Sequence, residues 1–264
     1  MMKESEKAEE KYRILAGKTE NEVRPAVGNE TIGIAEQPFE RREETAATAV
    51  LPFERTEEEY YVEKLGQIGK KPFYSFVKRL FDIFASGIGI LLLFIPMLII
   101  AAVVACSSKG GAFYTQERLG LNGRKFKLVK FRSMRKDAEK NGAQWSNGDQ
   151  DARITKVGRF LRKTRLDELP QLFCIFIGTM TIVGPRPERE IFYEKFEEYV
   201  HGFSERLKVK PGLTGLAQIN GGYDLKPEEK VVYDIEYIKT RSIRLDLKIM
   251  FKTVAVIFNH KGAK

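Results

Sequence analysis

The chain has 264 residues, of which 43% are hydrophobic and 31% charged, a composition that excludes a wholly disordered polypeptide. Its formal net charge of +9 is unevenly distributed: residues 1–64 hold ten Lys or Arg against sixteen Asp or Glu, a net charge of −6, and residues 65–264 carry +15. The basic part predicts an anionic partner such as nucleic acid, a phospholipid surface or a phosphorylated substrate. The two cysteines sit in apolar runs and the two histidines lie far apart, which argues against a disulfide framework, a zinc centre and a serine–histidine catalytic site.

Residues 1–69 are predicted to be a flexible, mostly disordered extension. They are rich in Glu, Ala and Thr and poor in large apolar residues, so they cannot bury a core of their own. No apolar run follows the initial methionine, which argues against a signal peptide.

Residues 70–108 are predicted to anchor the chain in a membrane. Residues 83–106 contain no charged side chain, and these 24 residues exceed the roughly 20 that a helix needs to cross a bilayer. Pro96 lies inside this run, where it removes a backbone hydrogen bond and bends a helix into two arms, each too short to span. Both flanks are basic and prefer the cytoplasm, so the sequence favours a re-entrant helix–break–helix over the alternative, a straight transmembrane helix.

Residues 109–264 are predicted to form a cytosolic domain at the membrane surface, α+β in class and mostly helical. Asn122-Gly123 lies between two stretches that alternate polar and apolar residues, a pattern that predicts a small β-hairpin with a two-residue turn. Residues 136–151 are expected to be a polar loop.

The stretch from residue 152 to 180 has helical spacing. Apolar residues share one face and basic residues occupy the others, as expected of an amphipathic helix that lies on an anionic membrane; a solvated surface helix is the alternative. The apolar face consists of Ile154, Val157, Phe160 and Leu161.

Three more segments complete the predicted domain. "VGPRPERE" reads as a rigid turn with a proline on each side of Arg186, and "KPGLTGLAQINGG" as a glycine-rich, turn-like segment. A charged helix is expected within residues 188–209, and a pair of helices, the last one amphipathic, within residues 226–259.

Asp167 and Glu168 are the candidate catalytic residues. They follow a run of basic residues, and the segment from Thr164 to Asp167 also fits a capping box that would simply start a helix at Leu166. In a functional interpretation, one carboxylate attacks phosphorus to form an acyl-phosphate, while the pair holds Mg²⁺ or accepts a proton. Nearby guanidinium groups would stabilise the phosphoryl oxygens.

Five further residues are candidates for binding phosphate or nucleotide. The two prolines restrict the backbone around Arg186, so its guanidinium can bind a phosphate in bidentate fashion with little loss of conformational entropy. A structural turn whose Arg pairs with a nearby Glu is equally compatible with the sequence. The other candidates are Lys130 and Arg132 in "VKFRSM", which could instead form an exposed hairpin face, together with Arg153 and Gln218. No Walker loop and no dinucleotide-binding glycine motif occurs in the sequence.

Taken in order, six motifs and Pro96 resemble the bacterial sugar transferase family, the small monotopic phosphoglycosyl transferases. The match extends from about Phe76 to Phe251 and excludes the extension. Many members carry Ser-Pro at the helix break, where this chain has Ile95-Pro96. The motifs are "KRLFDI", "FYTQERLGLNGRKFKLVKFRSM", "RITKVGRFLRKTRLDELPQLF", "VGPRPE", "KPGLTGLAQING" and "LDLKIM".

The resemblance implies an enzyme of the bacterial cytoplasmic membrane whose catalytic domain faces the cytoplasm. Such an enzyme transfers a sugar-1-phosphate from a UDP-sugar to polyprenyl (undecaprenyl) phosphate, releases UMP, requires Mg²⁺ and starts a surface glycan such as an exopolysaccharide or capsule. It implies Asp167 as the nucleophile that carries the phospho-sugar and as a residue near the metal. Glu168 would be a metal ligand or proton acceptor, and Arg186 would lie near the phosphates. Phospholipid is the implied surface partner, and a homo-oligomer is left open.

Two other functions compete with this one. A non-catalytic membrane scaffold or anionic-lipid-binding module needs only the basic helices and the apolar anchor, but it gives no reason for the Asp167–Glu168 pair among arginines. A nucleic-acid binder is suggested by charge alone, and the long apolar run and missing aromatic–basic stacking motif argue against nucleic acid as a partner.

Overall fold

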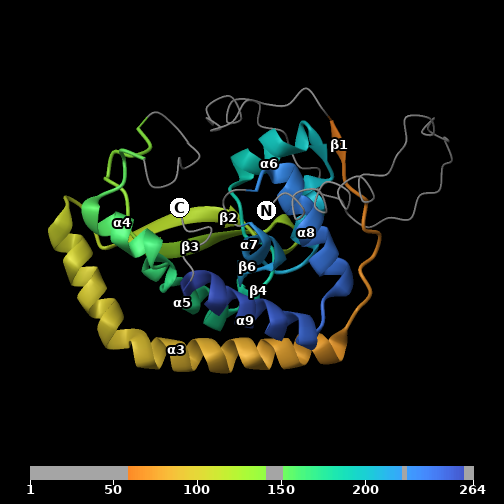
Figure 1. The fold of residues 1–264 in the computed structure, drawn as a ribbon, viewed down its shortest axis with the longest axis horizontal. Helices are drawn as coiled ribbons and strands as arrows, with labels where there is room; N and C mark the ends of the chain where they lie inside the picture. Colours follow the sequence, from red (N-terminus) through yellow and green to blue (C-terminus); the bar gives the residue numbers. More distant parts are fainter. Residues whose placement is uncertain (1–58, 141–150, 222–224, 259–264) are drawn as a thin grey trace.

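The computed structural model of the chain describes residues 59–140, 151–221 and 225–258. Residues 1–58 of the predicted extension and residues 141–150 of the predicted polar loop lie outside this part. The described residues are mostly helical with some sheet, as the sequence predicts, and they include one long apolar helix. Figure 1 shows the rest of the fold packed on one side of that helix.

The long helix is α3, Pro72–Ser107, which starts with proline in its first turn and has Pro96 in its interior. By length and composition α3 can cross a membrane. Figure 1 shows that the last part of α3 bends out of line with the rest of the helix and rises beside α4 (Lys156–Lys163). An internal proline is the usual cause of such a bend, because it removes one helical hydrogen bond and clashes with the preceding turn.

The first half of α3 is tied to the domain by polar side chains. The Asp82 carboxylate is buried and accepts hydrogen bonds from the Thr181 hydroxyl at 2.7 Å and the Ile182 N–H at 3.0 Å, both in strand β4 (Thr181–Val183). Nearer the helix start, Lys78 forms a salt bridge of 2.7 Å with Asp246 of helix α9 (Ile243–Phe258). These contacts fix the apolar helix relative to β4 and α9.

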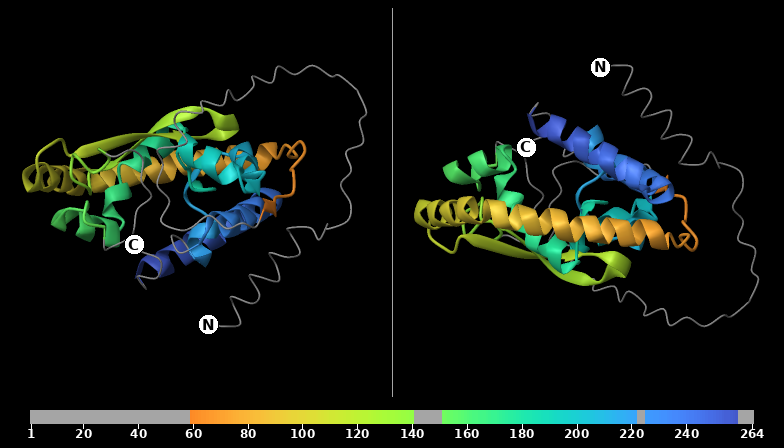
Figure 2. Two further views of the ribbon diagram at one scale, coloured as in Figure 1. Left: turned by 90° about the horizontal axis from the view of Figure 1, so that it is seen from above. Right: turned by 90° about the horizontal axis from the view of Figure 1, so that it is seen from below.

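The predicted β-hairpin is confirmed. Strands β2 (Phe113–Leu119) and β3 (Lys125–Phe131) pair antiparallel with Phe113 opposite Phe131 and Leu119 opposite Lys125. The predicted two-residue turn is wrong, because residues 120–124 form a longer loop that contains the short helix η1 (Leu121–Gly123). Asn122 and Gly123 still adopt positive φ angles of 54° and 74°, which is why this dipeptide favours a reversal. The hairpin lies along one side of α3 and α9 along the other (Figure 2).

The predicted amphipathic stretch is broken into three short helices: α4, η3 (Leu166–Glu168) and α5 (Gln171–Ile177). The predicted capping box is also wrong. The Thr164 hydroxyl donates back to the carbonyl oxygens of Phe160 and Leu161 at 2.8 and 3.2 Å, and it therefore closes α4 instead of opening the next helix. Phe160 was expected beside Leu161 on the apolar face, yet it is 61% exposed while Leu161 is buried.

The glycine-rich segment contains more structure than predicted. It forms strand β6 (Gly212–Thr214), which pairs parallel with β4, and then the short helix α7 (Leu216–Asn220). Gly212 allows this pairing, because a Cβ atom there would lie only 2.1 Å from the Gly184 nitrogen. The close approach holds the "KPGLTG" segment against the "GPRP" turn.

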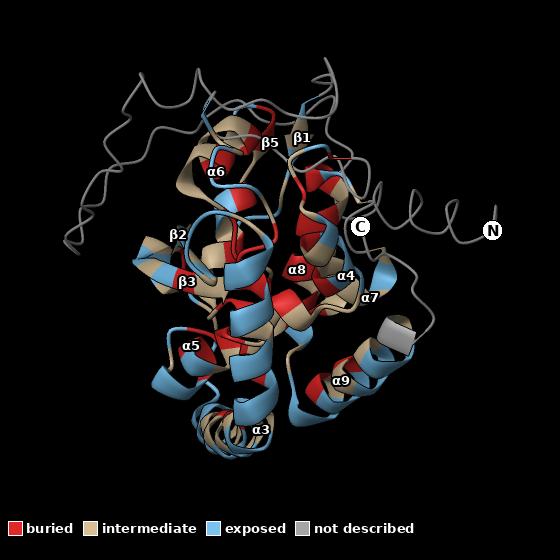
Figure 3. Cartoon of the chain, turned by 90° about the vertical axis from the view of Figure 1, so that its left-hand side faces the viewer, coloured by how far each residue is buried: buried red, intermediate tan, exposed pale blue. Residues whose placement is uncertain are grey.

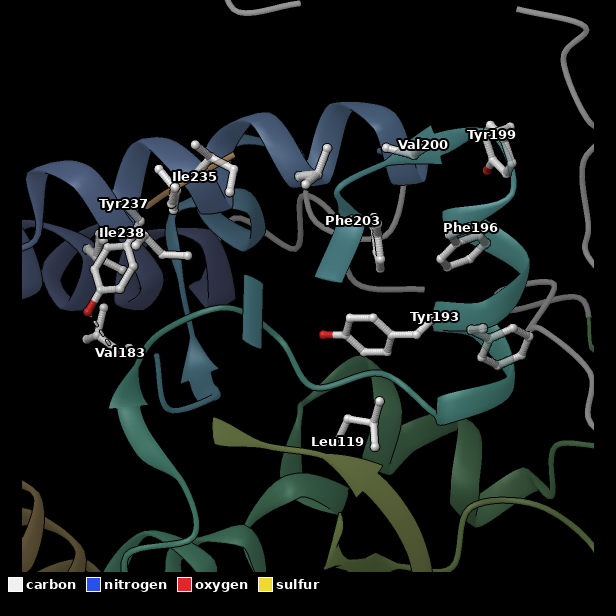
Figure 4. Packing of buried hydrophobic residues seen from close by; sticks show 14 residues of the cluster. Leu119, Val183, Tyr193, Phe196, Tyr199, Val200, Phe203, Ile235, Tyr237 and Ile238 are labelled. Atoms are coloured by element: carbon white, nitrogen blue, oxygen red, sulfur yellow. Dashed lines mark hydrogen bonds between the residues drawn. The ribbon is translucent and has the colours of Figure 1, made fainter. Parts of the chain in front are cut away.

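The remaining elements enclose the main core. They are α6 (Glu190–Glu197), strand β5 (Val200–His201), η4 (Phe203–Lys208) and α8 (Pro227–Thr240). Helices α8 and α9 confirm the predicted pair of C-terminal helices. Figure 4 shows the aromatic side chains of α6 and η4 packed together on one side of this core, with the apolar side chains of α8 on the other. Strand β1 (Tyr60–Tyr61) pairs parallel with β5, and Leu65 is buried in the same core, so the packed domain includes residues that precede Lys70.

Large apolar side chains are exposed on α3, α5 and α9. Figure 3 shows exposed residues on α3 and α9 at the same end of the molecule. An apolar surface of this size needs a cover, and a lipid bilayer supplies one. The exposed side chains outside α3 include Phe173, Phe176 and Ile177 of α5 and Leu247, Phe251 and Val254 of α9.

Candidate active site

The Asp167–Glu168 pair lies in η3, next to the second arm of α3. Arg165, with a left-handed φ of 59°, ends the preceding helix and redirects the chain into η3. Leu166 and Leu169 flank the pair and pack in one cluster with Met97 and Val104, which follow Pro96 in α3. The bend in the apolar helix therefore brings its second arm against the segment that carries the two carboxylates.

The Asp167 carboxylate is buried, and no described residue pairs with it. The side chain is only 6% exposed, and among the described residues no hydrogen bond or salt bridge reaches it. Burial, followed by the charge of Glu168, raises the pKa of Asp167 above its ordinary value, while Lys130 and Arg162 oppose part of this rise. A basic carboxylate with unused lone pairs, near cations, is available to react or to bind a metal ion.

Glu168 has the opposite environment. Its carboxylate pairs with the Arg186 guanidinium, which donates to Glu168 Oε1 through Nη2 and to Oε2 through Nη1 at 3.4 Å. Burial alone would raise the pKa of Glu168, but the charge and hydrogen bonds of Arg186 outweigh burial and lower it. Adjacent carboxylates in contrasting surroundings are suited to different roles.

Lys130 of β3 faces the pair from the hairpin. Burial, reinforced by the positive charge of Arg118, lowers the pKa of Lys130 to about 8, and the charges of Asp167 and Glu168 oppose this change. Its ammonium group lies 5.4 Å from the centre of the Tyr114 ring. The structure thus brings together four of the predicted site residues, namely Asp167, Glu168, Arg186 and Lys130.

Arg132 and Arg153 have other partners. Arg132 is buried and donates to the carbonyl oxygens of Lys109, Val104 and Ser108 at 2.9, 3.2 and 2.9 Å, so it satisfies acceptors at the C-terminal end of α3. Arg153 pairs with the Asp151 carboxylate through Nε at 2.8 Å and Nη2 at 2.6 Å. Neither contact requires a phosphate ligand.

Replacing Arg132 with methionine is expected to lower the free energy of unfolding by about 1–3 kcal/mol, because buried carbonyl oxygens lose their donors. The KM for a nucleotide-sugar donor should stay within about two-fold of the wild-type value. Thermal unfolding of the purified protein and donor titration measure the two quantities. Arg124→Met, on the exposed hairpin loop, is the matched control. A large rise in KM without loss of stability would instead assign Arg132 to phosphate binding.

Sequence comparison extends the motif resemblance over most of the chain. The family model described as "Bacterial sugar transferase" matches residues 73–260. The chain belongs to the bacterial sugar transferase family. The matched range includes α3 except for its first residue, the Asp167–Glu168 dyad and both C-terminal helices.

Several named bacterial proteins are similar to this chain. A UDP-N-acetylgalactosamine-undecaprenyl-phosphate N-acetylgalactosaminephosphotransferase of Aeromonas hydrophila is 39% identical over 76% of the chain and 48% of its own length. A UDP-glucose:undecaprenyl-phosphate glucose-1-phosphate transferase of Klebsiella pneumoniae is 44% identical over 70% of the chain and 41% of its own length. A putative undecaprenyl-phosphate N-acetylgalactosaminyl 1-phosphate transferase of Bacillus subtilis is 49% identical over 51% of the chain and 74% of its own length. The chain therefore spans less than half the length of the first two relatives.

Gln218 lies in α7, three residues after Gly215, whose backbone closely approaches Gly184. A Cβ atom on Gly215 would meet the Gly184 carbonyl oxygen at 2.2 Å and Gln218 Oε1 at 2.7 Å, so the amide sits beside the segment that leads to Arg186. Both amide atoms of Gln218 are buried, and neither finds a hydrogen-bond partner among the described residues. The Gln218 amide therefore has donor and acceptor capacity that no described residue uses.

Sequence reasoning did not single out two groups of charged residues that lie near the dyad or inside the core. Arg162 and Arg118 contribute positive charge around Lys130, although the sequence offered them only as members of basic stretches. Arg118 also donates to Glu188 Oε2 at 3.1 Å and to the Pro187 carbonyl oxygen at 3.2 Å. The second group is buried and polar, and its members, Asp82, Arg206 and Asp234, carry no local signal of their burial.

Proposed function

We propose that this chain transfers a sugar-1-phosphate from a UDP-sugar to polyprenyl phosphate, most simply undecaprenyl phosphate, and releases UMP. The observation that carries this proposal is the buried Asp167 carboxylate, which no hydrogen bond or salt bridge from a described residue reaches, which lies among Lys130, Arg162 and Arg186, and which adjoins the apolar helix α3. The activities named for its relatives support the same class of reaction.

The proposed reaction has two steps at one phosphorus atom. In the first, an Asp167 carboxylate oxygen attacks the β-phosphorus of the UDP-sugar, and the bond to the bridging oxygen breaks, which releases UMP with the electron pair. In the second, a phosphate oxygen of the lipid attacks the same phosphorus and displaces the Asp167 carboxylate. The product is a polyprenyl diphosphate sugar, the first lipid-linked intermediate of a surface glycan such as an exopolysaccharide or capsule.

The contrast within the dyad supports this division of roles. Glu168 is held by Arg186 and keeps its negative charge, so it can orient Arg186 or share a metal ion without competing as nucleophile. Asp167 is the more basic carboxylate and has its lone pairs available. The cations nearby would stabilise the oxygens of the transferring phosphoryl group.

Mg²⁺ fits this site through a small set of ligands. The described residues contain no cluster of three or more His, Cys, Asp or Glu side chains able to enclose a metal ion. Mg²⁺ commonly uses one or two carboxylates together with substrate phosphates, and Asp167 and Glu168 provide that number. When bound with substrate, the ion would neutralise charge on the phosphate oxygens.

The apolar surface and the charge distribution support a position at the cytoplasmic face of the bacterial membrane. The exposed side chains of α3, α5 and α9 suit a lipid environment, while both flanks of α3 are basic. A re-entrant α3 with both ends on the cytoplasmic side would keep the dyad at headgroup level, where a soluble nucleotide and a lipid phosphate can meet. Phospholipid is then the surrounding partner.

The proposed function is tested by UMP release from a panel of UDP-sugars, using the purified membrane protein and polyprenyl phosphate. We expect release with at least one donor, loss of release after removal of divalent ions with EDTA, and recovery when Mg²⁺ is added back. The scaffold hypothesis predicts no release with any donor. It also predicts that an Asp167→Asn variant restores the phenotype of a deletion strain fully.

Replacing Gln218 with leucine is expected to raise the KM for the UDP-sugar by about ten-fold and to change kcat little, because a neutral amide contributes about 1–1.5 kcal/mol to ligand binding. Donor titration in the UMP-release assay measures both constants. Asn220→Leu is the matched control, since the Asn220 side chain is exposed and donates to the Leu216 carbonyl oxygen of its own helix. Equal effects of the two substitutions would remove Gln218 from the nucleotide site.

A further inference from the structure

The turn that carries Arg186 is held by hydrogen bonds from other elements. Pro185 and Pro187 have no N–H groups, so this turn has few donors with which to build backbone bonds of its own. Its three consecutive carbonyl oxygens instead accept from three separate elements. The donors are the Gly212 N–H of β6 (2.8 Å, to Pro185), Nη2 of Arg206 in η4 (2.9 Å, to Arg186) and Nη1 of Arg118 in β2 (3.2 Å, to Pro187).

The central donor, Arg206, is itself fixed inside the core. Its side chain is 2% exposed, and Nε donates to Asp234 Oδ2 of α8 at 2.6 Å. The guanidinium also lies 4.6 Å from the centre of the Phe203 ring and 5.7 Å from that of Tyr193. One guanidinium therefore joins α8, the aromatic core and the backbone of the Arg186 turn.

A buried ion pair is a poor way to stabilise a core. Removing both charges from water is costly, and apolar residues of similar volume commonly serve stability equally well. Unlike an apolar pair, the Arg206–Asp234 pair also supplies a hydrogen-bond donor to the turn, because Arg206 Nη2 donates to the Arg186 carbonyl oxygen. The position of that oxygen in turn limits where the Arg186 side chain can reach Glu168.

We infer that the Arg206–Asp234 pair is a positioning device for Arg186 in sugar-phosphate transfer. Asp234 orients the Arg206 guanidinium by accepting from its Nε, and Arg206 Nη2 then fixes the position of the Arg186 turn relative to η3. Arg206 touches neither the dyad nor a substrate phosphate in this role; it acts through Arg186. This inference rests on the proposed function.

The test is a double-mutant cycle in the UMP-release assay. Arg206→Lys keeps the positive charge but cannot pair with Asp234 and hold the Arg186 carbonyl oxygen in the same fork geometry. We expect kcat/KM to fall about 10- to 50-fold in Arg206→Lys alone. In an Arg186→Ala background the same change should lower kcat/KM less than three-fold, because the group that it positions is already absent.

Two further variants separate positioning from folding. The double variant Arg206→Met/Asp234→Leu removes the pair without leaving a buried charge; it should keep the wild-type melting temperature within a few degrees and lose as much activity as Arg206→Lys. Lys239→Met, which breaks the exposed pair with Glu63, is the control and should remain fully active.

Three outcomes would count against these claims, and they are distinguishable. Wild-type activity in Arg206→Lys, in a protein whose Arg186→Ala variant is impaired, would overturn the positioning role alone. Independent, multiplicative losses in the cycle, together with a lowered melting temperature, would make the pair merely structural. A wild-type protein that releases UMP from no UDP-sugar would refute the proposed function itself.

Discussion

Asp167→Asn is expected to abolish sugar-phosphate transfer, lowering the rate of UMP release by about 10⁴-fold or more, the scale seen when a nucleophile is removed. Asparagine has nearly the same shape, so the packing of Leu166 and Leu169 against α3 should survive. Its amide oxygen is a poor nucleophile toward phosphorus and carries no charge for Mg²⁺. The loss should therefore appear in kcat, with the protein still recovered in the membrane fraction.

Asp137→Asn is the matched control, because Asp137 is an exposed aspartate on the same domain. A second measurement detects the covalent aspartyl phospho-sugar directly. Incubation with labelled UDP-sugar and no lipid acceptor should leave the label on the peptide that contains Asp167. The covalent route is wrong if an active preparation yields no labelled peptide, or if the asparagine variant turns over at the wild-type rate.

Gly158→Ala is expected to destabilise the domain, although alanine favours a helix over glycine by about 1 kcal/mol. Gly158 lies inside α4, where an added Cβ atom would stand 1.9 Å from the Ser133 carbonyl oxygen and 2.5 Å from its carbon. That oxygen also accepts from the Thr155 N–H at 3.0 Å, so it cannot retreat without loss. Overpacking of this kind costs about 1–3 kcal/mol or more, and it outweighs the helical gain.

We expect a net loss of about 1–3 kcal/mol, measured by thermal or chemical unfolding of the purified protein. Activity should fall as well, since α4 carries Arg162, one of the cations around Asp167. Gly111→Ala is the control, because nothing lies within 4 Å of a Cβ atom at that position. A more stable Gly158→Ala protein would show that α4 can move away from the hairpin without cost.

The features that sequence reasoning predicted well are those encoded locally. The hairpin, the uncharged helix with its internal proline and the C-terminal helices each depend on spacing within a few turns of chain. The dyad was recognisable because Asp167 and Glu168 stand directly between a basic and an apolar stretch. Lys130 and Arg186 were candidates for binding phosphate, and the structure places both near the dyad.

The features that were missed depend on contacts between distant segments. The pairing of β4 with β6 joins residues about thirty positions apart, and no pattern in "KPGLTG" announces its partner. In the sequence, Arg132 follows a stretch that alternates basic and apolar residues, and it was a candidate phosphate ligand for that reason. Its acceptors lie at the C-terminal end of α3, which reaches Arg132 only in the folded state. The burial of Asp82 is likewise fixed by Thr181 and Ile182 from far along the chain.

Strand β1 has a practical consequence for handling this protein. It joins β5 at the edge of the domain remote from α3 (Figure 1), so the described chain begins on the side that faces away from the apolar surface. An affinity handle or fluorescent reporter fused ahead of Glu59 would thus be carried clear of the bilayer and of the dyad. Fusion at that end should leave detergent extraction and turnover unchanged.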